Sequence, residues 1–225
     1  MKLKAVIFDL DNTLLDLMRM KSYCIDAAID AMIDAGFSMP KKKALKILHS
    51  MYDTDIENQK IFQKFLRKTT NKVDQRMLAY AILAYRRVKL GFLTPYPGAK
   101  QTLITIKEAG LKLAVVSDAP REQAWQRLCA LKLDDFFDVV VTFDDTKKHK
   151  PSKEPFLKAL GKLKVKPEEC LMVGDWPERD IVGAKELGMK TAFAKYGNIN
   201  HTGKKIADFK LDKISDLKSI IKILK

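Results

Sequence analysis

The chain lacks both a membrane-spanning run and the cysteine pattern of a disulfide framework or a zinc site. No apolar stretch approaches the roughly 20 residues that a spanning helix needs. The three cysteines, Cys24, Cys129 and Cys170, are odd in number and form no C-x-x-C pair. Each lies in an apolar neighbourhood, so we expect three reduced residues that pack in the interior.

The beginning of the sequence also lacks the features of a signal peptide. Met1 to Lys4 lead straight into a short apolar run, which Asp9 and Asp11 interrupt. A signal peptide instead carries an unbroken apolar segment of about 7–15 residues. We therefore expect a cytoplasmic protein that makes no contact with a membrane.

Negative charge is scarce relative to positive charge, since 42 Lys and Arg residues against 28 Asp and Glu give a net charge of +14. An excess of this kind is found in proteins that bind nucleic acid. The lysines, however, alternate with acids along amphipathic stretches, and no aromatic–basic cluster stands out. We therefore expect no nucleic-acid partner. Asn and Gln are few, five and six residues, which beside many Lys and Glu is typical of a thermophile's surface.

Strand patterns are almost absent from residues 17–92. Apolar residues recur there at helical spacing in four stretches, near 25–33, 44–48, 61–66 and 73–90. Four amphipathic helices with short connections predict a helical bundle. The region carries 15 Lys and Arg against 7 Asp and Glu. Solvated helix faces explain most of this excess, and a positively charged lid that attracts anionic substrates remains an alternative.

The rest of the chain alternates between short apolar runs and amphipathic stretches. This alternation predicts an α/β fold with a three-layer Rossmann-like core, in which helices cover both faces of a parallel sheet. Strands are predicted at residues 4–9, 113–116, 139–141, 171–173 and 191–194, with a short last strand near Phe209. Helices are predicted at 97–109, 120–131, 155–163, 180–187 and 214–224, and a polar loop at 144–153.

The most informative pattern lies at the first strand. Val6 to Phe8 form a buried run, followed by Asp9, Asp11 and a polar turn. Period-2 alternation predicts that these two acids point to the same side of the chain. Two close carboxylates call for a cation, and Mg²⁺ fits because it prefers carboxylate and phosphate oxygens. The alternative is a turn made of its usual residues.

Polar residues also accompany the other central strands. Ser117 and Asp118 follow the second strand, Lys150 lies in a loop before a helix, and Asp175 and Asp180 follow the fourth strand. Ligands of open α/β sheets bind at the carboxyl ends of the strands. Each residue has an ordinary alternative as a helix cap, a turn residue or a loop lysine. Together, four such sites favour a functional centre.

The order and spacing of these residues resemble the haloacid dehalogenase (HAD) superfamily of phosphohydrolases. Residues 9–14 match its D-x-D-x-T-L motif, and Ser117 matches the strand-end Ser/Thr of its second motif. Lys150-Pro151 matches the third motif, and residues 174–180 match the fourth, G-D-x-x-x-x-D. The resemblance covers essentially the whole chain. It implies a Mg²⁺-dependent hydrolase acting on phosphoric monoester bonds.

The resemblance also implies how the chain is divided. Residues 1–15 and 94–225 would form the hydrolase core, and residues 16–93 would form a small all-helical cap domain. In this family the cap closes over the leaving group and selects it.

The family's chemistry assigns a role to each acid. Asp9 would be the nucleophile that forms an aspartyl-phosphate, and Asp11 the general acid and then the general base. Mg²⁺ would be held by Asp9, the backbone carbonyl of Asp11 and Asp175. Asp180 would bind a metal-bound water or pair with Lys150, which would balance the negative charge of the site.

The substrate's phosphoryl group would contact a second, overlapping set of residues. Ser117 and neighbouring backbone N–H groups would hold the phosphoryl oxygens. We expect the full set of substrate-binding residues to be Asp9, Asp11, Ser117, Asp118 and Lys150. The partner is then a small phosphomonoester, for which we expect a sugar or triose phosphate resembling glyceraldehyde 3-phosphate. The oligomeric state, monomer or homodimer, stays open.

Other activities of the same fold remain alternatives. A dehalogenase attacks carbon and needs no acid at position 11, so Asp11 argues for phosphoryl transfer. A phosphomutase would use the same site, a phosphonatase would need a cap lysine such as Lys21, and an inert binding module would have lost catalysis. The residues that select the substrate cannot be chosen from the sequence, and the candidates are Arg19, Lys21, Tyr23, Tyr85, Arg86 and Trp176.

Overall fold

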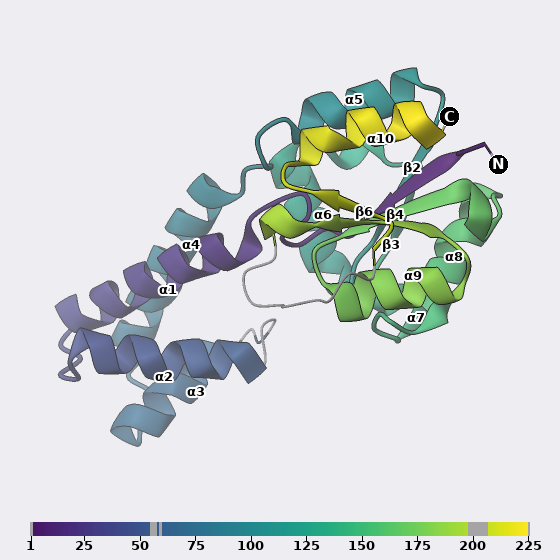
Figure 1. Ribbon diagram of the computed structural model, residues 1–225. Helices are drawn as coiled ribbons and strands as arrows, with labels where there is room; N and C mark the ends of the chain where they lie inside the picture. The colour runs from purple at the N-terminus through teal and green to yellow at the C-terminus, as the bar shows by residue number, and fades with distance from the viewer. Residues whose placement is uncertain (1, 55–57, 59, 198–206, 225) are drawn as a thin grey trace. The chain divides into compact units, whose positions relative to one another are not determined.

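The computed structural model describes residues 2–54, 58, 60–197 and 207–224 (Figure 1). The chain divides into two compact units. Unit 1 consists of Met1–Asp16 and Thr94–Lys225, and unit 2 consists of Leu17–Leu93.

Over its described residues, unit 1 is built on six parallel strands in the order β3-β2-β1-β4-β5-β6. All residues of β1 are buried, and Val6 lies opposite Leu113 of β2 on one side and Leu171 of β4 on the other. A continuous apolar run is what a strand covered on both faces needs. The strands are β1 (Ala5–Phe8), β2 (Lys112–Val116), β3 (Val139–Val141), β4 (Cys170–Gly174), β5 (Lys190–Ala194) and β6 (Phe209–Leu211).

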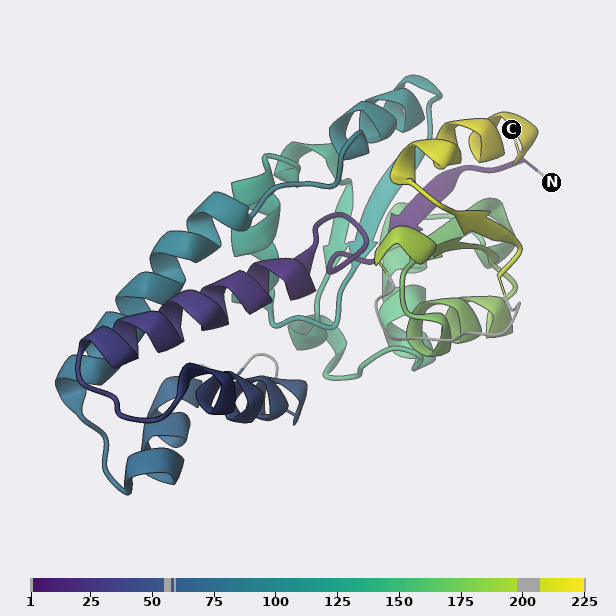
Figure 2. The same ribbon diagram turned by 60° about the vertical axis from the view of Figure 1, so that its left-hand side comes forward.

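Helices cover both faces of the sheet, as Figure 1 and Figure 2 show. Helices α5 (Ala99–Glu108) and α10 (Leu217–Leu224) lie together on one face. Helices α8 (Lys153–Leu163) and α9 (Val182–Glu186) cover the other, where Ile7 and Phe156 belong to one buried apolar cluster. The predicted three-layer α/β fold is therefore confirmed.

The strand order brings three loops to one edge of the sheet. Strands β2, β1 and β4 are direct neighbours and run in the same direction. The loops that follow them must leave from the same edge, where open α/β sheets bind their ligands. These loops, with the one before α8, carry the predicted site residues.

Two expectations about this unit were wrong, and one helix boundary differs slightly. The predicted polar loop at 144–153 begins within a short helix, α7 (Phe143–Thr146), which a capping box between Thr142 and Asp145 starts. The helix expected from about residue 180 is present as α9, which begins at Val182 and continues directly from a wider helical turn at Pro177–Ile181. Cys129 is exposed on α6 (Arg121–Leu131), whereas the other two cysteines are buried as expected.

The described residues of unit 2 form four helices, in agreement with the predicted helical insertion. They are α1 (Leu17–Asp34), α2 (Lys41–Thr54), α3 (Ile61–Thr70) and α4 (Gln75–Phe92). Ile29, Leu48 and Phe65 lie in its apolar core, since their helices place apolar residues at a spacing of three and four. In neither unit does a helix over the described residues have the length and apolar character needed to cross a membrane.

Candidate active site

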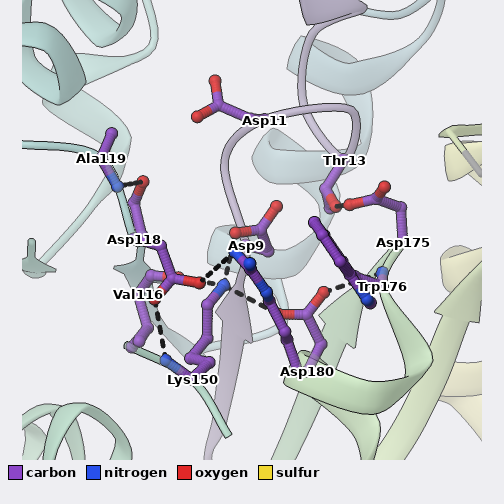
Figure 3. Close-up of polar contacts among 12 residues, drawn as sticks. Asp9, Asp11, Thr13, Val116, Asp118, Ala119, Lys150, Asp175, Trp176 and Asp180 are labelled. Carbon is purple, nitrogen blue, oxygen red and sulfur yellow. Dashed lines mark hydrogen bonds and ion pairs between the residues drawn. The ribbon is translucent and has the colours of Figure 1, made fainter. Parts of the chain in front are cut away.

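Lys150 lies at the centre of the polar side chains that unit 1 gathers at this edge of the sheet (Figure 3). Its ammonium group donates to Asp9 Oδ1 at 2.5 Å, to the Val116 carbonyl at 2.9 Å, and contacts Asp180 Oδ1 at 2.7 Å. Three partners match the three N–H groups of a lysine. With a side chain that is 2% exposed, Lys150 is a fixed, buried positive charge.

Three carboxylates surround this charge. Oxygens of Asp9, Asp175 and Asp180 lie within 4.8 Å of one another, and all three residues are buried. Gly174 makes the arrangement possible, because a Cβ at that position would lie 2.3 Å from the Asp180 carboxyl carbon. The Asp180 carboxylate also accepts a hydrogen bond of 3.0 Å from the backbone N–H of Trp176. We name Asp9, Asp175 and Asp180 the acid cluster.

If all three acids of the acid cluster were ionised, one ammonium group would not neutralise them. Burial raises the pKa of Asp9 to about 7, against the lowering effect of Lys150. Burial, followed by repulsion from Asp9 and Asp180, raises the pKa of Asp175 to about 9. The pKa of Asp180 is also raised, again chiefly by burial. Burial disfavours the charge on Lys150, but Asp180 and Asp9 together raise its pKa well above the usual range.

These properties fit a hard divalent cation. The acid cluster offers only carboxylate oxygens, which are the ligands that Mg²⁺ prefers. The pKa values of Asp9 and Asp175 are raised, so a further positive charge beside them would favour their ionised forms. The structure thus brings together three of the four predicted metal-binding residues.

The fourth, Asp11, points elsewhere. Figure 3 shows its carboxylate turned away from Asp9. It pairs instead with Arg127 of α6, whose Nη1 lies 2.6 Å from Asp11 Oδ2. The prediction that both acids point to the same side was wrong, because β1 ends at Phe8 and strand alternation does not extend into the turn. The predicted metal contact of Asp11 is through its backbone carbonyl and stays a prediction.

Ser117 and Asp118 lie beside the acid cluster at the end of β2. The Ser117 hydroxyl accepts a hydrogen bond of 3.1 Å from the backbone N–H of Ala119. Asp118 accepts a bond of 2.9 Å from the backbone N–H of Lys150 and another of 3.4 Å from Arg179. Asp118 therefore fixes the loop that carries Lys150, a role that the sequence did not indicate.

Further residues hold the loop after β1 and were missed in the sequence. Thr13 donates to Asp175 Oδ1 at 3.2 Å, and Tyr196 donates to the backbone carbonyl of Thr13 at 2.8 Å. Gly197 lies so close that a Cβ there would be 1.5 Å from the Asn12 carbonyl oxygen. These contacts join segments that are more than 160 residues apart in the chain, and a glycine after a strand is the only local signal for them.

Trp176 forms part of the rim of the site. The Arg179 guanidinium carbon lies 3.8 Å from the centroid of the Trp176 ring, within the range of a cation–π contact. Arg179 also reaches Asp118 and is 39% exposed. The pair places an aromatic and a cationic group next to Asp118.

Comparisons with known proteins agree with this geometry. A glyceraldehyde 3-phosphate phosphatase of Methanocaldococcus jannaschii is 33% identical over 227 residues, covering 99% of this chain and 99% of that protein. The pyrophosphatase PpaX of Bacillus thuringiensis is 34% identical over 231 residues, covering 98% and 97%. The crystal structure of a HAD phosphatase from Thermococcus onnurineus is 28% identical with a TM-score of 0.70, covering 97% of this chain and 98% of that one.

The family match covers most of the chain, residues 6–194. It includes the loops that carry the acid cluster and Lys150. The chain belongs to the haloacid dehalogenase-like hydrolases.

Proposed function

We propose that this protein is a Mg²⁺-dependent phosphatase of small phosphomonoesters, with triose phosphates as the first substrate class. The observation that carries the proposal is the acid cluster around Lys150, located at the carboxyl edge of a HAD-type sheet. The relatives named glyceraldehyde 3-phosphate phosphatases support the choice of substrate.

In this proposal Asp9 attacks phosphorus. Its backbone N–H donates to the Val173 carbonyl at 2.8 Å, and Lys150 holds Oδ1, so the side chain is fixed for an in-line approach. Two P–O bonds change: one forms to Asp9, and the bond to the leaving alcohol breaks. Water then attacks the phosphorus of the aspartyl-phosphate, which releases phosphate and restores the carboxylate.

Bound Mg²⁺ would ionise the acid cluster and offset the charge of the incoming phosphate. Asp9 and Asp175 would hold it, with the backbone carbonyl of Asp11, and Asp180 would support Lys150 or a bound water. The Asp180–Lys150 distance of 2.7 Å favours the first of these two roles for Asp180. Lys150 would stabilise the negative charge on the transferred phosphoryl group.

The remaining polar groups would bind and protonate the substrate. The Ser117 hydroxyl would donate to a phosphoryl oxygen. Asp11 would protonate the leaving oxygen and later take a proton from the attacking water. Unit 2 would act as the cap, with its polar side chains selecting the leaving group. Lys21 is a candidate because it is a buried cation of that unit, 5.5 Å from the centre of the Tyr52 ring.

The direct test is phosphate release from a panel of metabolite phosphates that includes glyceraldehyde 3-phosphate and pyrophosphate. We expect turnover of a triose phosphate with Mg²⁺, and none with EDTA or in Asp9→Asn. Preference for pyrophosphate would place the chain with its PpaX relatives instead. An isomeric phosphate ester as the product would indicate a phosphomutase. Halide release from an added 2-haloacid in the presence of EDTA would indicate a dehalogenase.

A further inference from the structure

We propose that Arg127 is a positioning residue that holds Asp11 away from the acid cluster, and that Asp11 acts only when this ion pair opens. The inference rests on the proposed phosphatase function, in which Asp11 is the general acid. It concerns the direction in which the carboxylate points.

The ion pair is short and mostly removed from solvent. Arg127 Nη1 lies 2.6 Å from Asp11 Oδ2, and the two side chains are 4% and 21% exposed. A charge-assisted contact at this distance is among the stronger polar interactions in proteins. Because Figure 3 shows the Asp11 carboxylate turned away from Asp9, the pair keeps it from the place where a leaving oxygen would lie.

Both ends of the pair are attached to fixed backbone. The helix α6 packs through the buried residues Ala124, Leu128 and Leu131. At the start of this helix, the backbone N–H of Arg121 donates to the Asp144 carboxylate at 2.7 Å. A charged residue on the apolar side of a helix is costly unless it has a partner, which indicates that Arg127 is placed for this contact.

The loop at the other end is also fixed. Leu14 donates to the Leu10 carbonyl at 2.9 Å, and Tyr196 donates to the Thr13 carbonyl at 2.8 Å. Rotation of the Asp11 side chain is therefore the movement that brings the carboxylate to the leaving oxygen. Arg127 competes with that engaged position, so its removal shifts the population toward it.

The dependence of rate on the leaving group tests this proposal. The alkoxide of glyceraldehyde 3-phosphate is a strong base and needs a proton to depart, whereas p-nitrophenolate departs without one. The readout is the ratio of kcat/KM for glyceraldehyde 3-phosphate to kcat/KM for p-nitrophenyl phosphate. A structural role of Arg127 would lower both values together and leave this ratio unchanged.

We expect Arg127→Met to raise the ratio at least about threefold, since Asp11 is released to the engaged position. Arg127→Lys keeps a cation and should return the ratio to within about twofold of the wild type. Arg121→Met is the matched control, because it removes an exposed ion pair of 3.0 Å from the same helix and should not change the ratio. If Arg127→Met does not fold, Arg127→Gln replaces it.

The Asp11→Asn background completes the test. There the effect of Arg127→Met on the ratio should vanish, because no acid is left to be released. An unchanged or lower ratio in Arg127→Met, with wild-type protein active, would overturn the proposal. Absence of phosphate release from both substrates in the wild type would instead refute the proposed function.

Discussion

The two units bury polar side chains very differently. Among the described residues, unit 1 buries ten polar or charged side chains, and most of them meet at one edge of its sheet. Unit 2 buries one, Lys21, and otherwise packs by apolar contacts between helices. Burial of charge is costly without partners, so the charged residues that cluster in unit 1 are candidates for a functional role. The polar residues of unit 2 lie mostly on helix surfaces and carry no comparable signal.

The largest expected effect is a loss of catalytic rate from a change in unit 1 alone. Asp9→Asn removes the nucleophile but keeps the size of the side chain and its place beside Lys150. We expect kcat to fall on the order of 10⁴- to 10⁶-fold, as for other enzymes that lose a nucleophile. Phosphate release in the presence of Mg²⁺ measures this effect, and thermal unfolding should confirm that the variant is folded. Turnover within tenfold of the wild type would remove Asp9 from the mechanism.

The second effect concerns the buried positive charge. Lys150→Ala should lower kcat at least ~100-fold, the scale of one lost electrostatic stabiliser. It should also lower the free energy of unfolding by about 3–5 kcal/mol, because the acids are left without their partner. Urea unfolding measures the stability term. Lys153→Ala is the matched control: Lys153 is 52% exposed and 3.5 Å from Glu186, so its removal should change neither quantity appreciably. Near-normal turnover of Lys150→Ala would contradict the assignment.

The third effect is the dependence of stability on pH and metal. An acid whose pKa is raised in the folded protein stabilises the fold at low pH. This contribution is complete below the pKa of the unfolded chain, about 3.8, and is lost as the pH rises through the pKa of the folded protein. For Asp9 that folded pKa is about 7 and for Asp175 about 9. Without metal, these two groups should therefore lower the unfolding temperature progressively from pH 4 to pH 9.

Mg²⁺ should restore the unfolding temperature, and it should raise that temperature more at pH 9 than at pH 5. At a concentration 100 times its Kd the gain is about 2.7 kcal/mol, or roughly 5–10 °C for a protein of this size. Calorimetry of the wild type and Asp175→Asn measures both terms, because the variant should show a flatter pH profile and a smaller gain. Equal pH profiles for the two proteins would show that the acid cluster does not control stability.

The smallest expected effect is a change in substrate preference from a substitution in unit 2. The Lys21 ammonium group lies 5.5 Å from the centre of the Tyr52 ring, and the Lys21 residue is 5% exposed. If unit 2 selects the substrate, Lys21→Met should change the preference among phosphomonoesters by roughly tenfold, the scale of one altered substrate contact. The preference is the ratio of kcat/KM values across the substrate panel. Lys46→Met on the exposed surface of α2 is the control, and equal preferences in both variants would leave Lys21 with a structural role.

Sequence patterns predicted the parts of the site that lie where a strand ends. Asp9, Ser117 and Asp175 follow from local periodicity and the rule that parallel sheets bind ligands at one edge. Lys150 lies in a loop between two helices, and only the resemblance to the family's third motif indicated it. The orientation of Asp11 did not follow, because strand alternation stops where the strand stops, and the exact end of a strand is poorly defined by sequence.

The supporting residues depend on tertiary pairing, which periodicity does not report. Arg127 meets Asp11 across 116 positions of the chain, and Tyr196 meets Thr13 across 183. One local signal did exist for Arg127, since it shares the buried side of α6 with Ala124 and Leu128. A charged residue on an apolar stripe indicates a buried partner, although not which one.

The account's central claim is that Asp9 becomes phosphorylated, and reductive trapping tests it most directly. Asp11→Asn should accumulate the aspartyl-phosphate from p-nitrophenyl phosphate. The p-nitrophenolate leaving group departs without a proton, so the intermediate still forms, whereas its hydrolysis is slow because the attacking water has no general base. Acid quenching and borohydride reduction should then convert residue 9 to homoserine, seen in the mass of its peptide. We expect this conversion only with both substrate and Mg²⁺ present. A burst of p-nitrophenolate with residue 9 unmodified, or with another residue reduced, would contradict the account.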